Sequence, residues 1–316
     1  MKDGMKKFLS SVLFLLILAG LLWGLDLFLR PKTNDAAGGF RDPTAAGVLG
    51  EPPGTLDVLF LGDSEVFSSY IPLEIWGECG VCSYALGTPN QELYYSLEWL
   101  KEVLKTQQPK LVILETNDAF KPIDFTDQFS ITAEHLFPVF RYHDRWKSLQ
   151  GRDLDWRLSY TSLDPNKGYW YRTRSEAADP GDYMSPTDYK MPLPALNRYY
   201  IEQIRKTCEE GGCRLILTGA PCPLYQDRSR HNTLAELCRE MNVEYIDMKL
   251  MIPELEIRWE EDSLDGGDHL NYAGALKVSR WWSAYFEQSG LFRDKRQDPS
   301  YAAWNEALRT FRLSQP

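Results

Sequence analysis

The chain has 316 residues, ten tryptophans and a hydrophobic fraction of 43%, which is ample material for a large core and excludes a wholly disordered protein. Its formal net charge of −10 argues against nucleic-acid binding, which needs a basic surface. The same acidic balance gives no support to a polybasic role at a membrane surface.

The first thirty residues predict one membrane-spanning segment. Phe8 to Leu25 contains no charged residue, and at about 1.5 Å per residue it can cross the roughly 30 Å hydrocarbon core. Lysines precede it in residues 1–7, so we expect a cytoplasmic amino terminus and an uncleaved signal anchor over residues 8–29. A signal peptide cleaved near Ala36-Ala37 is the alternative. In both cases the remaining chain lies outside the cytoplasm.

Strand and helix patterns alternate after this segment. Residues 30–54 are rich in Pro, Gly and Ala, and they predict a linker. The pattern then predicts strands and helices in turn: strand 56–62, helix 71–78, strand 81–86, helix 90–106 with Asn90 as its N-cap, and strand 110–115.

Residues 118–190 interrupt this alternation. They are aromatic, charged and punctuated by Pro and Gly, and we interpret them as an insertion over the carboxyl edge of the sheet. Their aromatic side chains could form a carbohydrate platform or, as we favour, pack the insertion against the sheet. Alternation then returns with helix 192–210, strand 214–218, helix 232–241, strand 244–246 and a helix after Asn271. Residues 291–316 carry apolar side chains at helical spacing and predict a docked helical tail.

Six cysteines make disulfides possible in an oxidising compartment. Cys79-x-x-Cys82 also has the spacing of metal ligands, but no second such pair exists and the chain has four histidines. We therefore predict structural cysteines and expect neither a metal nor a cofactor.

Polar residues stand where the predicted strands end. Gly62-Asp63-Ser64 closes the first strand, Leu86-Gly87 the second and Glu115-Thr116-Asn117-Asp118 the third, while Asp265-Gly-Gly-Asp268-His269 precedes the last helix. Active sites of α/β proteins lie at the carboxyl ends of the strands. Alternatively, Ser64 merely caps a helix and His269 and Asn117 are ordinary loop residues.

Together these four segments resemble the blocks of the SGNH/GDSL hydrolase family, which supply Ser, Gly, Asn and His in this order. The resemblance covers about residues 55–290, with the insertion at about 118–190. It implies a three-layer α/β/α sandwich with a parallel, flavodoxin-like sheet, here preceded by one transmembrane helix. It also implies that Ser64 is the nucleophile and His269 its general base. The oxyanion hole would comprise the backbone N–H groups of Ser64 and Gly87 and the amide of Asn117.

The chain departs from the family pattern at two positions. Glu115 stands where the third block usually has glycine. Gly266 occupies the usual position of the acid, three residues before the histidine. A one-residue bulge at the two glycines would let Asp265 orient the imidazole, and we prefer it to Asp268, which adjoins His269. A Ser–His dyad without an acid is the third possibility.

The leading functional hypothesis is an extracytoplasmic O-acyltransferase or esterase that uses an acyl-serine intermediate. A single anchor with an external SGNH domain resembles cell-surface proteins that work beside multi-span membrane O-acyltransferases. The glutamate that follows the serine, Glu65, is similar to the residue found in the branch of these proteins that alanylates envelope polymers. The acceptor would be an envelope polysaccharide or a teichoic-acid-like polymer. Alternatives are a carboxylesterase or lipase for small or lipid esters, and a non-catalytic scaffold for a membrane acyltransferase.

Overall fold

The computed structural model describes residues 2–315 and divides them into two compact units. Unit 1 comprises the N-terminal residues up to Pro43 together with Ile123–Ser162, and unit 2 comprises Thr44–Pro122 and Leu163 to the C-terminus. The predicted insertion is therefore split, because its first half belongs with the N-terminal helix and its second half with the sheet.

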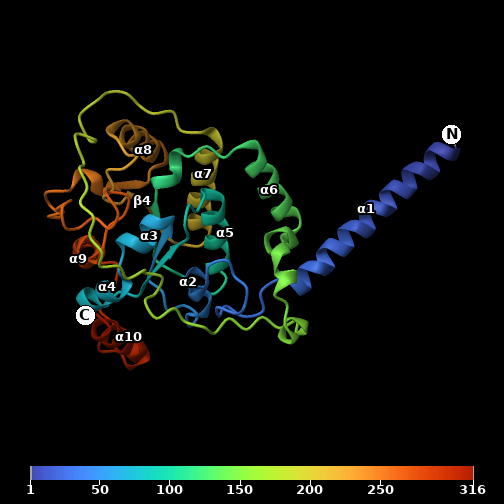
Figure 1. Cartoon of the computed structure of the whole chain (residues 1–316), viewed down its shortest axis with the longest axis horizontal. Helices are drawn as coiled ribbons and strands as arrows, with labels where there is room; N and C mark the ends of the chain where they lie inside the picture. Colours follow the sequence, from blue (N-terminus) through green and yellow to red (C-terminus); the bar gives the residue numbers. More distant parts are fainter. Residues whose placement is uncertain (1, 316) are drawn as a thin grey trace. The chain divides into compact units, whose positions relative to one another are not determined.

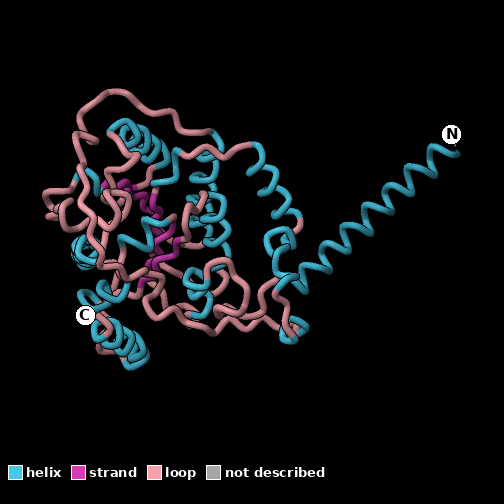
Figure 2. Tube along the Cα trace, in the orientation of Figure 1, coloured by secondary structure: helices cyan, strands magenta, loops and turns pink. Residues whose placement is uncertain are grey.

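A five-stranded parallel sheet forms the centre of unit 2 (Figure 2). The strands lie in the order β2-β1-β3-β4-β5, which is the flavodoxin-like order. Their bounds are β1 Val58–Gly62, β2 Ser83–Gly87, β3 Leu111–Glu115, β4 Arg214–Gly219 and β5 Glu244–Asp247. The predicted α/β class and parallel sheet are confirmed.

Helices cover both faces of this sheet, so unit 2 has three layers (Figure 1). Alternate strand residues such as Val58 and Phe60 pack in a core with Trp282 and Phe286 of α9. The intervening residues, such as Leu59, are also fully buried, because the other face is covered. The helices of unit 2 are α2 Pro43–Ala46 (which begins one residue before it), α3 Ser64–Ser69, α4 Pro72–Cys79, α5 Leu93–Val103, α7 Ala195–Glu210, α8 Arg228–Met241, α9 Tyr272–Ser289 and α10 Ala302–Leu313.

Two boundaries differ from the sequence prediction. Asn90 does not cap α5, because its φ of +51° places it in a left-handed turn and the helix begins only after Glu92. Helix α8 begins four residues earlier than its hydrophobic pattern suggests, since Asp227 accepts the backbone N–H of Arg230 and caps it. The second half of the predicted linker contains the buried residues Ala45, Ala46 and Val48.

Unit 1 contains the long N-terminal helix α1 (Lys2–Leu29). It also contains α6 (Phe125–Leu136) and the 3₁₀ segments η3 (Pro138–Lys147) and η4 (Gly151–Leu154), which come later in the chain than the first three strands of the sheet. Within Asp3–Leu29 of α1, the most apolar window of 18 residues has a mean hydropathy of 2.5, and most of that window is exposed. By length and composition α1 can cross a membrane, a property that an anchor shares with a signal sequence.

The six cysteines are buried free thiols. They pack as small apolar residues in the interior of unit 2, and burial raises the pKa of the Cys79 thiol to about 11. The possibility of disulfides among them is not realised in this structure.

Candidate active site

Ser64 is the first residue of α3, directly after the turn that closes β1. The cap of α3 is Asp63, whose side chain accepts the backbone N–H of Glu65 at 3.0 Å. The alternative reading of Ser64 as a capping residue is therefore wrong, and its hydroxyl is left for another role. Because β1 and β3 are neighbours at the point where the strand order reverses, Ser64 lies at the crevice where such sheets bind ligands.

His269 reaches Ser64 from a loop two hundred residues away in sequence. Its Nε2 lies 2.8 Å from the Ser64 Oγ, and its Nδ1 lies 2.8 Å from Oδ2 of Asp265. When Nδ1 donates to Asp265, Nε2 presents a lone pair to the serine hydroxyl. This is the arrangement that lets an imidazole remove the serine proton.

Asp265 is placed to fix the imidazole, whereas Asp268 is not. The other oxygen of Asp265 accepts the backbone N–H of His269 at 2.8 Å, so one carboxylate holds both the ring and its backbone. Asp268 lies 3.7 Å from Nδ1. Gly266 and Gly267 have φ values of +76° and +103°, and these left-handed conformations let the chain turn between Asp265 and His269. The geometry thus favours Asp265 over both Asp268 and a dyad without an acid.

The two other residues predicted for the oxyanion hole lie beside the turn that carries Ser64. Gly87 pairs with Gly62 across β1 and β2, and a Cβ on Gly87 would lie 2.4 Å from the backbone oxygen of Asp63. Only glycine fits there. The Asn117 amide donates from Nδ2 to Oδ2 of Asp63 at 2.9 Å, which leaves its second N–H for a substrate oxygen.

Asn117 is held by Asp63 and by two further residues, Glu115 and Gln226. The sequence predicted none of these contacts. Glu115 accepts the backbone N–H of Asn117 at 2.7 Å, while Gln226 donates from Nε2 to its side-chain oxygen. Gln226 is buried in the loop after β4 and fixes which end of the Asn117 amide faces Asp63. The Glu115 carboxylate also accepts the N–H of Ala220 at 3.2 Å.

Several buried carboxyls surround this turn. Burial and the neighbouring charge of Glu115 raise the pKa of Asp63 to about 7, although the bonds from Asn117 and Glu65 oppose the shift. Burial likewise raises the pKa of Glu115 to about 7, against the attraction of Lys249. For Asp118 burial and the charge of Asp63 raise the pKa to about 7. These groups are therefore far more protonated near neutral pH than ordinary carboxyls.

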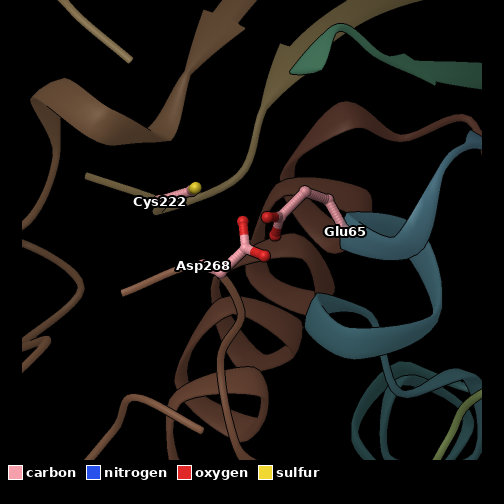
Figure 3. Close-up of side chains that lie close together, drawn as sticks. All are labelled: Glu65, Cys222 and Asp268. Carbon is pink, nitrogen blue, oxygen red and sulfur yellow. The ribbon is translucent and has the colours of Figure 1, made fainter. Parts of the chain in front are cut away.

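Glu65, Cys222 and Asp268 form a cluster that the sequence did not predict (Figure 3). Their potential ligand atoms lie within 4.8 Å of one another, and Figure 3 shows the Glu65 and Asp268 carboxyls facing each other. Burial, with the charges of Asp63, Glu115 and Asp268, raises the pKa of Glu65 well above its usual range, and burial also raises that of the Cys222 thiol. These shifts favour the protonated forms of Glu65 and Cys222, which lowers the repulsion within the cluster.

The second half of the insertion runs beside the site. The Trp170 ring stacks on Phe67 of α3 with a centroid distance of 4.2 Å, and the backbone N–H of Trp170 donates to the Phe67 carbonyl at 2.9 Å. Further along, the backbone carbonyl of Glu176 accepts the N–H of Gly266 in the loop that carries His269. Residues 170–178 therefore contact both segments that carry the predicted nucleophile and base.

Comparisons with known proteins identify no family. No family model matches the chain, and no curated protein matches it. A crystal structure assigned as an acylhydrolase of Bacteroides fragilis has 11% identity and a TM-score of 0.40, covering 82% of this chain and 99% of its own. A protein assigned to the G-D-S-L lipolytic family of Desulfitobacterium hafniense has 13% identity and a TM-score of 0.39, covering 72% and 97%. A GDSL-like lipase of Bacteroides thetaiotaomicron has 10% identity and a TM-score of 0.36, covering 73% and 88%. Likenesses at this level carry no information on chemistry, which is inferred below from the geometry of the site.

Proposed function

We propose that this chain is a serine-dependent acyl-transfer enzyme, an esterase or O-acyltransferase, that acts on a cell-envelope glycopolymer outside the cytoplasm. The observation that carries the proposal is the hydrogen-bonded series from Ser64 through His269 to Asp265. A serine hydroxyl is a weak nucleophile at neutral pH unless a base lies within hydrogen-bonding distance, and here it does.

In the proposed first step the Ser64 Oγ attacks the carbonyl carbon of an ester, and His269 Nε2 takes the serine proton. Negative charge develops on the carbonyl oxygen, and the second N–H of Asn117 and the backbone N–H groups of Ser64 and Gly87 would stabilise it. The tetrahedral intermediate then collapses, the carbon–oxygen bond to the alcohol breaks, and the leaving alcohol takes the proton from His269. The acyl group remains on Ser64.

In the second step a hydroxyl group attacks the acyl-serine. His269 takes a proton from water or from a sugar hydroxyl, whose oxygen forms the new bond to the acyl carbon. Collapse returns the proton to Ser64 and releases an acid or a new ester. Water as the acceptor makes the chain an esterase, and a sugar hydroxyl makes it a transferase.

The cellular setting supports the glycopolymer part of the proposal. Helix α1 is long and apolar enough to be an anchor, and Lys6 and Lys7 precede its apolar run. An anchor in that orientation keeps unit 2 beside the polymers of the envelope, with a multi-span acyltransferase as a possible source of acyl groups.

The test uses the full-length chain in detergent with p-nitrophenyl acetate, with and without envelope polymer. Wild type should release p-nitrophenol, and the polymer should acquire acetyl groups if the chain is a transferase. Ser64→Ala should abolish both reactions, whereas the exposed Ser185→Ala should change neither. Turnover of Ser64→Ala at the wild-type rate would refute Ser64 as the nucleophile, and no turnover by wild type would leave a scaffold role.

A further inference from the structure

We infer that the first half of the insertion, residues 123–158, rests on the outer surface of the lipid bilayer as a second membrane contact. The inference rests on α1 being the membrane anchor, as proposed above. It concerns a set of large apolar side chains in unit 1 that are exposed to solvent in the structure. We call this set the interfacial surface; its members are Phe129, Leu136, Phe140, Trp146, Leu154 and Trp156.

These side chains are too exposed to serve the core. Trp146 is 66% exposed and Trp156 74% exposed, although tryptophan is usually well buried in folded proteins. On α6, Phe129 and Leu136 are seven residues apart and so share one face of the helix. Phe140 and Trp146 are six residues apart on η3, which is two turns of a 3₁₀ helix and again one face. The apolar residues therefore gather on faces of their elements, which marks an interaction surface.

A second face of η3, which carries Arg145, is bound to the end of α1. Arg145 is buried and donates from Nη1 to the carbonyl of Leu29 at 2.7 Å, while its Nη2 pairs with Asp153. Asp26 and Leu29, at the same end of α1, are buried, although most of α1 is exposed. Residues 123–158 are thus fixed to the C-terminal end of the helix.

A second attachment joins the stretch that carries Trp156 to the residues after α1. Ser159 donates its backbone N–H to the carbonyl of Lys32 at 2.8 Å, and the Tyr160 hydroxyl donates to the carbonyl of Pro31 at 3.0 Å. Both attachments therefore reach the short segment where the chain leaves α1.

The depth of that segment in a bilayer follows from the sequence of α1. The uncharged run Phe8 to Leu25 is about 27 Å long at 1.5 Å per residue, which fills most of the roughly 30 Å hydrocarbon core. The charged pair Asp26 and Arg30 then lies at the boundary with the headgroups. Because Leu29, Pro31 and Lys32 follow at once, the segments bonded to them lie at headgroup level. Tryptophan is enriched at that depth, where an apolar ring and a polar N–H are both accommodated.

The experiment uses the full-length chain, one copy per nanodisc, with a polarity-sensitive fluorophore on a single introduced cysteine. The native cysteines are buried, so only the new thiol should react. Trp146→Cys and Trp156→Cys probe the interfacial surface, and Leu16→Cys probes the anchor. His135→Cys is the matched control. His135 is exposed and lies on α6, as do Phe129 and Leu136 of the interfacial surface, but it points roughly 100° away from Leu136.

Nitroxide groups on the lipids then report contact. Near the headgroups they should quench the probes at positions 146 and 156 about twofold or more, while the probe at 135 stays unquenched. Deep nitroxides should quench the probe at position 16. Quenching at 16 without quenching at 146 and 156 would overturn the inference and leave the anchor intact. No quenching at 16 would refute the anchor, and with it this inference. Probes at 146 and 156 that are shielded from water but unquenched by lipid would show that protein, not lipid, covers the surface.

Discussion

At the scale of single residues, the site is built by side chains that hold other side chains. Asp265 bonds both the ring and the backbone of His269, and it thereby sets the imidazole's tautomer and its orientation toward Ser64. Gln226 and Asp63 hold the two ends of the Asn117 amide in the same way. Each contact constrains a group that has to act in the transition state.

Asp265 should therefore matter far more than Asp268. Asp265→Asn should lower kcat on p-nitrophenyl acetate by about 10³- to 10⁴-fold, because an amide at this position favours the wrong tautomer. Asp268→Asn serves as the control and should cost less than about tenfold, since its carboxylate lies 3.7 Å from the ring nitrogen. Steady-state kinetics on both variants decide the matter. Equal and mild losses would favour a Ser64–His269 dyad.

Gln226 should act as a positioning residue for Asn117. Asn117→Ala should reduce kcat about 10²- to 10³-fold through the loss of an oxyanion donor. Gln226→Ala should reduce kcat about tenfold with KM little changed, because it frees the amide to turn. In the double variant the Gln226 substitution should add almost nothing, since the residue it orients is absent. Fully additive losses would contradict this role.

The residues that the sequence revealed are those at the ends of predicted strands. Ser64, Gly87 and Asn117 each follow a short apolar run, and parallel strands bring such ends to one edge. Gln226 and Cys222 gave no comparable signal, because they lie in an irregular loop whose path depends on tertiary packing. The sequence favours Asp265 over Asp268 for two reasons: the two glycines make the required turn possible, and Asp268 adjoins His269.

At the scale of elements, helix α10 shows what the sequence pattern could predict. The aromatic stripe of the tail docks on α4, with the ring centroids of Trp76 and Trp304 5.5 Å apart and an Nε1 bond from Trp76 to Asn305 at 3.0 Å. The insertion was harder to predict. Its aromatic residues carry no period that distinguishes packing on the sheet from packing on α1, so the division of residues 118–190 between two units was not foreseen.

Removing the buried Trp304 side chain of α10 should destabilise unit 2. Trp304→Ala should lower its free energy of unfolding by about 3–5 kcal/mol, because a buried indole is lost and α4 is left uncovered. Leu313→Ala, on the same helix, is the matched control and should have almost no effect, since Leu313 is 78% exposed. Urea unfolding monitored by circular dichroism measures both variants. A Trp304→Ala loss no larger than that of the control would show that α10 does not stabilise the core.

At the scale of the whole molecule, buried acids make the stability of unit 2 depend on pH. Asp63, Glu115 and Asp118 have their pKa raised to about 7 by burial, so the folded chain keeps protons that the unfolded chain loses near pH 4. The stability that these protons provide is full below about pH 4 and is lost as the pH rises to about 7. Burial alone would raise the pKa of Asp247, but the charge of Lys249 outweighs it and lowers the pKa to about 2. The contribution of Asp247 to stability therefore changes only below about pH 4.

The melting temperature of the full-length chain in detergent should therefore contain a component that falls between about pH 4 and pH 7. Asp118→Asn should make that fall shallower, because it removes one of the three titrating groups without changing the side chain's shape. The exposed Asp188→Asn is the control and should leave the slope as it is. A slope unchanged by Asp118→Asn would show that this carboxyl titrates normally in the folded chain.

The central claim is that His269 activates Ser64 as a nucleophile, and active-site labelling tests it most directly. The full-length chain is treated with a fluorophosphonate, and the modified residue is located by peptide mass mapping. The account predicts one adduct on Ser64 in wild type, at least about a hundredfold slower labelling in His269→Ala, and none in Ser64→Ala. Labelling of another residue, or no labelling of wild type under conditions that modify a known serine esterase, would contradict it.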